Sequence, residues 1–337
     1  MHVKTTARLN RAFRFLRKGR GLFVLRLLTS IVVVACGLGA IYVYQNRTDA
    51  HAGAIVTAKH ISTTPVTKGV PQANSLFATY PSWIQDFATD SSSTLDSQYW
   101  NVYQGPAQSN NEAEYYTDNT ANLRIKNGAL ILEATQQTEP QNYNYASARI
   151  NTMGKKSFLY GRIDITAKLP NGVGTWPAAW LLPANSKYED LSPTSDISRY
   201  LNGGELDVIE QVGVNQNVEY GIVHTQSDIK NPGGVGVYNQ VTVNNNKYNL
   251  YSLLWTPTSI TFEVNNTPFF TYTKIAGADY TTWPFDQPFY LILNLALGGS
   301  WGGQDTAQFP PNGINNAALP ASMDIQSIYY YPYVGKS

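Results

Sequence analysis

Three carboxylates lie within six residues of one short stretch, residues 203–210, which reads Gly-Gly-Glu-Leu-Asp-Val-Ile-Glu. In an extended strand alternate side chains face the same side, so Glu205 and Asp207 share a face while Glu210 has the opposite parity. A β-bulge near residues 208–209 would insert one extra residue and return Glu210 to the face of Glu205. Because three acidic groups on one face repel one another, a purely structural role would be costly unless cations compensate.

This grouping suits the cleavage of a glycosidic bond. That reaction uses one ionised carboxylate to attack the anomeric carbon and one protonated carboxyl group to donate to the leaving oxygen, and retaining enzymes hold the two about 5 to 5.5 Å apart. Mutual repulsion keeps one carboxyl of such a pair protonated near neutral pH. Asp207, between the other two, would hydrogen-bond to the nucleophile and orient it. The alternatives for these six residues alone are a surface strand with scattered acids or a Ca²⁺ site made of carboxylates.

The rest of the chain predicts an all-β domain that could hold such a strand. The 337 residues include 23 Tyr, 7 Trp, 26 Gly and 18 Pro, a mixture that favours short strands and many turns over long helices. Turn residues at 126–128, 170–172 and 264–266 separate stretches rich in β-branched and aromatic residues. This spacing favours one sandwich or barrel, residues 81–337. The strand-like stretches are 129–134, 161–169, 206–212, 260–264, 289–295 and 325–331.

The first eighty residues are of a different kind. Residues 1–20 form a basic leader without an acidic residue, and no charge interrupts the apolar run from Leu27 to Tyr44. Such a run can cross most of a bilayer as a helix, so we expect one transmembrane signal anchor over residues 21–45. Cationic flanks stay in the cytoplasm, which places the rest of the chain on the extracytoplasmic side of the cell membrane. Residues 46–80, without a sustained apolar period, read as a flexible linker.

Two other interpretations of the N-terminus stay open. The run could be a signal peptide, since Ala50-His51-Ala52 could serve as a small-x-small cleavage site, and the protein would then be secreted. It could also be a buried helix, but a helix that is apolar all round needs a partner surface to cover it. The only cysteine, Cys36, lies inside the run, so the exported part would contain no disulfide.

The charge balance argues against one class of partner. Only 14% of the residues are charged and the net charge is +1, which gives no electrostatic footprint for nucleic acid. We therefore expect no nucleic-acid partner. We also expect the protein to be a monomer.

At several independent places the sequence resembles glycoside hydrolase family 16, laminarinase-type branch, over about residues 82–333. The spacing of Glu205, Asp207 and Glu210 matches the bulged Glu-x-Asp-x-x-Glu branch of that family, and not the unbulged Glu-x-Asp-x-Glu of lichenases and xyloglucan enzymes. The other matching segments are 83–87, 95–96, 100–101, 111–117, 147–150, 160–163, 167–170, 174–180, 283–285 and 291–301.

The resemblance implies a β-jelly-roll sandwich of the concanavalin A-like kind, whose concave sheet forms a cleft for several sugar units. Carried over by position, Glu205 resembles the nucleophile, Glu210 the general acid/base and Asp207 the residue that assists the nucleophile. The resemblance implies a retaining endo-hydrolase of β-1,3- or mixed β-1,3-1,4-glucan. Such an enzyme works through a covalent glycosyl-enzyme intermediate and needs no cofactor for its chemistry.

We expect six further side chains in the cleft, where a sugar can pack its C–H face on an aromatic ring and take hydrogen bonds at its edges. They are Trp176, Trp180, Arg149, His224, Asn111 and Trp301. Trp176 and Trp180 are four residues apart and so share a face of a regular strand, although bare tryptophans are more often core residues. His224 resembles the family's histidine near the leaving-group side, whereas a lone histidine is usually structural. Arg149 could bond a sugar hydroxyl or pair with a cleft carboxylate.

The sequence departs from the family pattern near its C-terminus. Many members carry, after Met-x-Val, an Asp that helps to bind a structural Ca²⁺, and the matching stretch here is Met-Asp-Ile-Gln at 323–326. Gln326 lacks the charge, which weakens the expectation of calcium, although Asp324 could compensate. The opening segment is also altered, with Gln-Asp-Phe at 85–87 where Asp-Glu-Phe is commoner.

Three other functions stay open. The glycosyl group could pass to a sugar hydroxyl instead of water, which would make the protein a transglycosylase. The substrate could be agar, carrageenan or another galactan. The sandwich could also bind carbohydrate without turnover, although the intact acids at Glu205, Asp207 and Glu210 argue against this. The polar loop at 185–202, just before the catalytic strand, could narrow one end of the cleft.

Overall fold

The computed structural model describes residues 76–89, 94–137, 143–185, 187–188, 202–229 and 236–335. The expected basic leader and membrane segment and the only cysteine lie outside these residues, as do most of the expected linker and of the polar loop at 185–202. Within the described ranges no helix has both the length and the apolar character that crossing a membrane requires. The membrane segment at 21–45 therefore stays a prediction.

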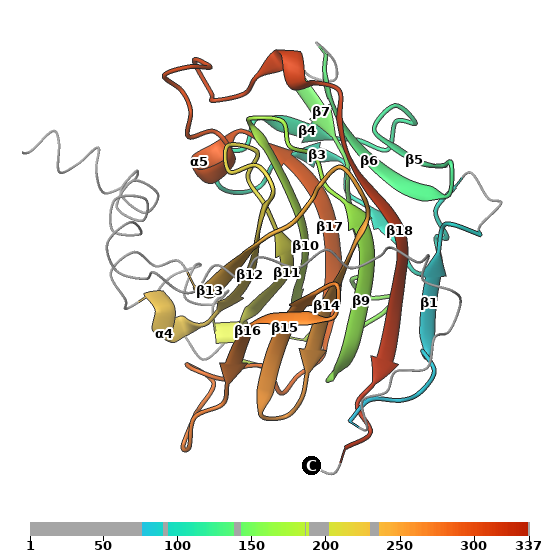
Figure 1. Cartoon of the computed structure of the whole chain (residues 1–337), viewed down its shortest axis with the longest axis vertical. Helices are drawn as coiled ribbons and strands as arrows, with labels where there is room; N and C mark the ends of the chain where they lie inside the picture. Colours follow the sequence, from blue (N-terminus) through green and yellow to red (C-terminus); the bar gives the residue numbers. More distant parts are fainter. Residues whose placement is uncertain are drawn as a thin grey trace, which may run out of the picture. The chain divides into compact units, whose positions relative to one another are not determined.

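Two β-sheets make up most of the described residues (Figure 1). The seven-stranded sheet has the order β13-β12-β11-β10-β17-β8-β2. Its strands are β2 (Asn101–Val102), β8 (Arg149–Asn151), β10 (Thr175–Pro183), β11 (Glu205–Glu210), β12 (Val218–His224), β13 (Val237–Thr242) and β17 (Phe289–Leu297). All pairings within this sheet are antiparallel.

The eleven-stranded sheet has the order β16-β15-β14-β9-β18-β6-β7-β4-β3, with β1 beside β18 and β5 beside β6. Its strands are β1 (Trp83–Asp86), β3 (Gly105–Pro106), β4 (Glu114–Tyr116), β5 (Leu123–Lys126), β6 (Ala129–Gln136), β7 (Tyr145–Ser147), β9 (Gly161–Lys168), β14 (Asn249–Trp255), β15 (Ser259–Val264), β16 (Thr267–Thr273) and β18 (Ala321–Pro332). Short helices α4 (Gln226–Ile229), α5 (Gly299–Gly302) and η2 (Asn316–Ala318) lie in the connections.

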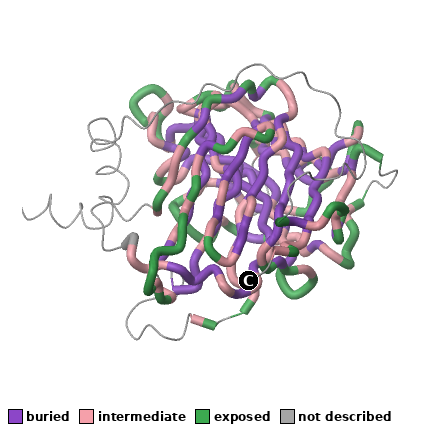
Figure 2. Tube along the Cα trace, turned by 60° about the horizontal axis from the view of Figure 1, so that its bottom comes forward, coloured by how far each residue is buried: buried purple, intermediate pink, exposed green. Residues whose placement is uncertain are grey.

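One hydrophobic core joins the two sheets. It contains Ile165 of β9 and Leu253 of β14 from one sheet, and Leu206 of β11 and Leu293 of β17 from the other, all with no exposed surface. Buried segments accordingly run through both layers in Figure 2. The predicted β-sandwich is confirmed, and each of the six expected strand-like stretches coincides with an observed strand to within a few residues.

Tight turns connect neighbouring strands where Asn and Gly allow a positive φ. Asn127 and Gly128 have φ of 55° and 76° between β5 and β6, and Asn265 and Asn266 have φ of 51° and 61° between β15 and β16. Two consecutive residues of this kind suit a two-residue hairpin, because the twist of such a turn matches that of the strands. The turns predicted at 126–128 and 264–266 are confirmed.

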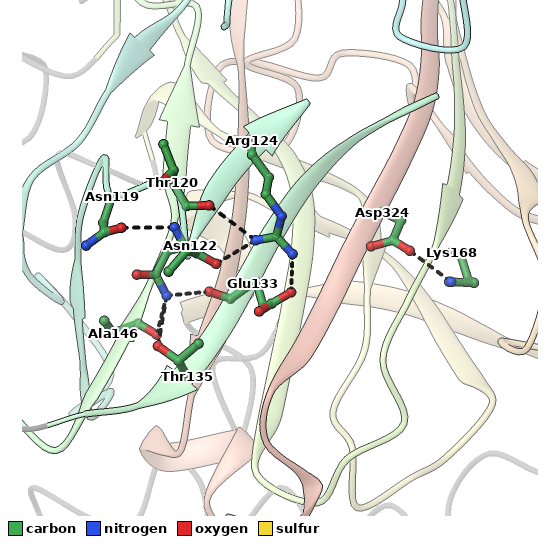
Figure 3. A network of polar contacts seen from close by, with 10 residues as sticks. Asn119, Thr120, Asn122, Arg124, Glu133, Thr135, Ala146, Lys168 and Asp324 are labelled. Atoms are coloured by element: carbon green, nitrogen blue, oxygen red, sulfur yellow. Dashed lines mark hydrogen bonds and ion pairs between the residues drawn. The ribbon is translucent and has the colours of Figure 1, made fainter. Parts of the chain in front are cut away.

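The buried side-chain amide of Asn122 connects two neighbouring strands of the eleven-stranded sheet, β6 and β7 (Figure 3). The Asn122 side chain, which has no exposed surface, donates to the carbonyl oxygens of Glu133 in β6 and Ala146 in β7 at 2.8 and 3.3 Å. Arg124 of β5 pairs with the Glu133 carboxylate on the same strand pair. These contacts satisfy polar groups that would otherwise be costly to bury.

The two ends of the described chain lie together on the eleven-stranded sheet. β1 pairs along β18, and Phe77 forms a bridge with Tyr333 just beyond it. The amide of Ala78 also donates to the Pro332 carbonyl at 2.8 Å. The chain therefore enters and leaves the sandwich on the sheet that does not contain β11.

Candidate active site

A bulge in β11 brings its three acids to one face. Asp207 pairs with Trp180 of β10, and Ile209 pairs with the preceding residue Ala179, so Val208 is the extra residue. The same register shift appears against β12 between Asp207 and Glu210. The predicted bulge is confirmed, and its result is that Glu210 lies on the same face as Glu205 and Asp207. We call this side of the seven-stranded sheet the site face.

The imidazole of His224 contacts two of these acids. Glu205 pairs with His224 across β11 and β12. The Nε2 atom of His224 lies 3.0 Å from Oδ2 of Asp207 and 3.6 Å from Oε1 of Glu205. The structure places the imidazole between Glu205 and Asp207, and the position near the leaving-group side that the resemblance implied stays a prediction.

Burial favours the protonated form of Glu210. Its carboxyl group has Oε1 2.7 Å from the indole N–H of Trp176. Burial raises the pKa of Glu210 to about 8, the negative charge of Asp207 contributes to the rise, and the His224 charge and the Trp176 hydrogen bond oppose it. A carboxyl group with this pKa can donate a proton near pH 7.

The carboxyl groups of Glu205 and Asp207 lie beside each other on the site face. Burial raises the pKa of Glu205 well above its ordinary value, and the charge of Asp207 and a hydrogen bond between the two carboxyl groups act in the same direction. Arg149 acts in the opposite direction through its positive charge. A second negative charge beside a buried carboxylate is unfavourable, which is why the charge of Asp207 raises the pKa of Glu205.

Trp180 and Arg149 lie on the β17 side of the acids. The indole N–H of Trp180 donates to Oδ1 of Asn294 at 2.7 Å, and the amide of Asn294 donates to the Tyr116 hydroxyl oxygen at 3.2 Å. The guanidinium carbon of Arg149 is 5.2 Å from the centre of the Trp180 ring and 5.9 Å from that of Tyr103. Trp176 and Trp180 share the site face, as predicted, and both side chains hydrogen-bond through their indole N–H groups.

Trp176 of β10 and Trp301 of α5 begin a row of aromatic rings that continues to β12 and β13. Their ring centroids are 5.6 Å apart, Trp301 and Tyr220 are 5.1 Å apart, and Tyr220 and Tyr238 are 6.0 Å apart. Tyr220 pairs with Glu210 across β11 and β12. We call Trp176, Trp301, Tyr220 and Tyr238 the aromatic row. Its two tryptophans were predicted, and its two tyrosines were not.

The segment that contains Asn111 contributes a different residue from the one expected. Asn111 itself is exposed, with φ of 57°. Its neighbour Glu112 forms a β-bridge with Gly298, and a Cβ atom on Gly299, whose φ is 73°, would lie 3.2 Å from Cγ of Glu112 and 3.3 Å from Cζ3 of Trp176. The negative charge of Glu112 also raises the pKa of Glu210. Glu112 is thus part of the electrostatic environment of Glu210.

Glu114 anchors this segment to β17. Its Oε2 accepts the Leu297 amide at 2.7 Å, and burial, followed by the charge of Glu112, raises the pKa of Glu114 to about 8. The sequence of residues 112–116, Glu-Ala-Glu-Tyr-Tyr, held a signal for Glu112, because alternation in an extended segment places Glu112, Glu114 and Tyr116 on one side.

The side chains that could hold a metal ion are three of the site residues already described. Among the described residues, Glu205, Asp207 and His224 can each offer one ligand atom with all three atoms within 4.8 Å of one another. Asp324, the possible calcium ligand, instead pairs with the Lys168 ammonium group, 2.8 Å away (Figure 3). The Lys168 charge compensates that of Asp324, so this carboxylate is not left with an unbalanced charge for a cation to neutralise.

Comparison with known proteins gives consistent matches. Residues 104–310 match the family described as Glycosyl hydrolases family 16. A beta-glucanase of Rhodothermus marinus is 34% identical over 263 residues, which cover 75% of this chain and 85% of that protein. A keratan-sulfate endo-1,4-beta-galactosidase of Sphingobacterium multivorum is 36% identical over 187 residues, which cover 56% of this chain and 40% of that protein.

Solved structures show the same likeness. The laminarinase from Rhodothermus marinus has a TM-score of 0.67 and 33% sequence identity, and the match covers 76% of this chain and 98% of that one. The residues matched by the family include the whole of β11, with its three acids, and β12, with His224.

Proposed function

Since the chain belongs to glycosyl hydrolases family 16, a family of glycoside hydrolases, we propose that it cleaves internal β-1,3 or mixed β-1,3-1,4 linkages of a glucan with retention of configuration. The observation that carries this proposal is the bulge at Val208, which places Glu205, Asp207 and Glu210 on one face. The chemistry of the family needs no cofactor.

In the first half of the reaction Glu205 is the nucleophile. One of its oxygens attacks the anomeric carbon and forms an ester with it, while Glu210 gives its proton to the glycosidic oxygen and the bond between that oxygen and the anomeric carbon breaks. The raised pKa of Glu210, about 8, supports its role as the acid. The hydrogen bond between Asp207 and Glu205 supports the expected assistance by Asp207.

In the second half Glu210, now a carboxylate, acts as the base. A water oxygen attacks the anomeric carbon, its proton passes to Glu210, and the ester bond to Glu205 breaks. The indole N–H of Trp176, 2.7 Å from Glu210, stabilises the carboxylate that this step requires.

The substrate assignment follows the relatives. The beta-glucanase of Rhodothermus marinus supports a β-glucan, and its similarity covers most of both chains. The identity of 36% to a keratan-sulfate endo-1,4-beta-galactosidase favours a galactan as the second candidate, although this chain spans only 40% of that protein. The same acids would cleave either candidate substrate, because the residues that determine which sugar binds are separate from those that cleave the bond.

We also propose that residues 81–337 are the catalytic domain, tethered by the linker at 46–80 to a membrane anchor at 21–45 and located outside the cytoplasm. The apolar run and its basic flank support this arrangement. Fractionation of cells that express the full chain tests it, because a cleaved signal peptide would release the protein into the medium.

One assay tests the catalytic proposal. The full chain is incubated with laminarin, lichenan and agarose, and reducing ends and product sizes are followed for the wild type, Glu205→Gln and Glu210→Gln. New reducing ends from laminarin or lichenan that are absent in both variants would support an endo-glucanase. NMR spectra in which the β-anomer of the product appears first would support retention of configuration. Ends from agarose alone would move the assignment to a galactan, and products longer than the substrate would identify a transglycosylase. A folded wild type that retains a glucan but cleaves none of the three would exclude the hydrolase.

A further inference from the structure

The segment that carries Glu112 holds a second acid, Glu114, which the proposed reaction does not use. The two are separated by one residue of an extended segment, so their side chains lie on the same side. Glu114 has no exposed surface, and its Oε2 accepts the Leu297 amide of β17 at 2.7 Å. Its other oxygen, Oε1, is also buried and accepts no hydrogen bond from the described residues.

A buried oxygen that accepts no hydrogen bond favours the protonated form of Glu114. In a carboxylate, Oε1 would carry negative charge in the interior without a hydrogen bond, which is costly. A protonated carboxyl group can instead donate, and the carboxylate of Glu112 is the acceptor with which Glu114 shares a hydrogen bond. Burial raises the pKa of Glu114 to about 8, which agrees with a protonated group at neutral pH.

Glu112 is a partly buried acid that its neighbours hold in the charged form. Burial raises the pKa of Glu112, and hydrogen bonds from Asn110 and Glu114 and the positive charge of Arg149 act against that rise. The amide of Asn110 donates to Oε1 of Glu112 at 3.3 Å. Asn110 is exposed, whereas Glu114 is buried, so Glu114 is the donor that water cannot replace.

The charge of Glu112 acts on the acid of the site. Gly299 lies between the side chain of Glu112 and the ring of Trp176, and the indole N–H of Trp176 is 2.7 Å from Glu210. Burial and the charge of Asp207 raise the pKa of Glu210, and the charge of Glu112 adds to that rise. A donor that keeps Glu112 charged therefore also favours the acid form of Glu210.

We propose that Glu114 is a positioning residue for the acid: its protonated carboxyl group donates to the Glu112 carboxylate and keeps that negative charge near Glu210. The proposal rests on the proposed function, since it concerns the proton that Glu210 gives to the glycosidic oxygen. Glu114 thereby extends the acid form of Glu210 to higher pH. The other charged or titratable groups around these acids are Tyr116 of β4, Arg149 of β8, Glu205 and Asp207 of β11 and His224 of β12.

The pH dependence of kcat/KM for the full-length protein on laminarin tests this role. Glu114→Leu removes the donor, so Glu112 is less readily charged and the alkaline limb of the profile moves to lower pH. The expected shift has the direction of the shift in Glu112→Gln and does not exceed it. Glu114→Gln is the matched variant and should keep the wild-type limb, because an amide can accept from Leu297 and donate to Glu112.

A double variant separates this role from a structural one. Glu112→Gln combined with Glu114→Leu should have the alkaline limb of Glu112→Gln alone, because Glu114 acts through Glu112. A further shift in the double variant, a wild-type limb in Glu114→Leu, or equal shifts in Glu114→Leu and Glu114→Gln would overturn the proposal. The control Asp118→Asn removes an exposed acid close to β4 and should keep the wild-type limb, and a shift as large as in Glu114→Leu would also overturn the proposal.

A second measurement needs neither activity nor a folded Glu114→Leu variant. Carbon-13 NMR of the side-chain carboxyl groups near neutral pH shows which glutamates are protonated, and loss of a signal in Glu114→Gln or Glu112→Gln assigns it. A protonated Glu114 beside an ionised Glu112 is the expected result, and the reverse or two ionised groups would overturn the proposal. A wild type that cleaves no polysaccharide would defeat the proposed function alone, because these spectra still decide where the proton lies.

Discussion

The indole N–H of Trp176 lies 2.7 Å from Oε1 of Glu210 and links β10 to the end of β11. This bond favours the carboxylate form of Glu210 and so lowers its pKa from the value that burial alone would give. The bulge makes the contact possible, because it turns Glu210 toward the face that Trp176 occupies.

Replacing Trp176 with Phe should move the alkaline limb of the kcat/KM profile to higher pH. Phe lacks the N–H that stabilises the carboxylate, so the pKa of Glu210 rises and its acid form persists to higher pH. We also expect kcat to fall about tenfold, since Glu210 must act as a carboxylate in the second step and loses a charge-assisted hydrogen bond. A pH series of initial rates measures both; an alkaline limb that moves to lower pH would contradict the assigned role of the bond.

Replacing Glu112 with Gln should move the same limb in the opposite direction. The charge of Glu112 raises the pKa of Glu210, so a neutral amide of similar shape lowers that pKa, and the acid form is lost at lower pH. The two variants are each other's control, since a general disturbance of the site would not shift the limb in opposite directions. Unchanged profiles in Glu112→Gln would show that solvent screens its charge.

His224→Gln should lower kcat by about ten- to a hundredfold while the protein stays folded. His224 lies 3.0 Å from Asp207 and 3.6 Å from Glu205, and loss of an ion-pair contact with a buried carboxylate costs roughly this factor. Circular dichroism and the thermal midpoint check the fold. A variant with wild-type kcat would show that the contact is structural.

Glu219→Gln should alter the dependence of stability on pH. Burial raises the pKa of Glu219 from 4.5 to about 8, so the folded protein keeps a proton that the unfolded chain loses above about pH 4.5. Wild-type stability therefore falls between about pH 4.5 and 8, by up to about 5 kcal/mol from this group, and the fall is complete above pH 8. Urea unfolding at pH 5 and pH 8 should show a smaller difference in Glu219→Gln. The exposed Asp118→Asn serves as control and should keep the wild-type difference.

The arrangement of the three acids in β11 could be predicted because it depends only on neighbouring residues of one strand. The parity of Glu205, Asp207 and Glu210 requires a bulge, and the structure has it at Val208. Glu112, Tyr220 and Tyr238 were missed, because each joins the site through its pairing with another strand or loop. Periodicity states which residues share a side of one strand, and it does not state which strands are neighbours or in what register.

The environment of Arg149 shows a second limit. The sequence offered a sugar hydroxyl or a carboxylate as its partner, whereas the guanidinium group lies over the rings of Trp180 and Tyr103. A contact between a charged group and aromatic rings cannot be read from the spacing of residues in the sequence, because its members come from three different strands or loops.

The extra residue at position 208 also bears on how the strand tolerates a change in its length. If Val208 were deleted, the strand would run regularly, and the last glutamate would follow Asp207 by two positions instead of three. By simple alternation it would again lie on the side of Glu205 and Asp207. The acids therefore keep their common side whether this position is present or absent. A one-codon insertion or deletion, which in an ordinary strand reverses every later side chain, could here be inherited without reversing the last of the three acids.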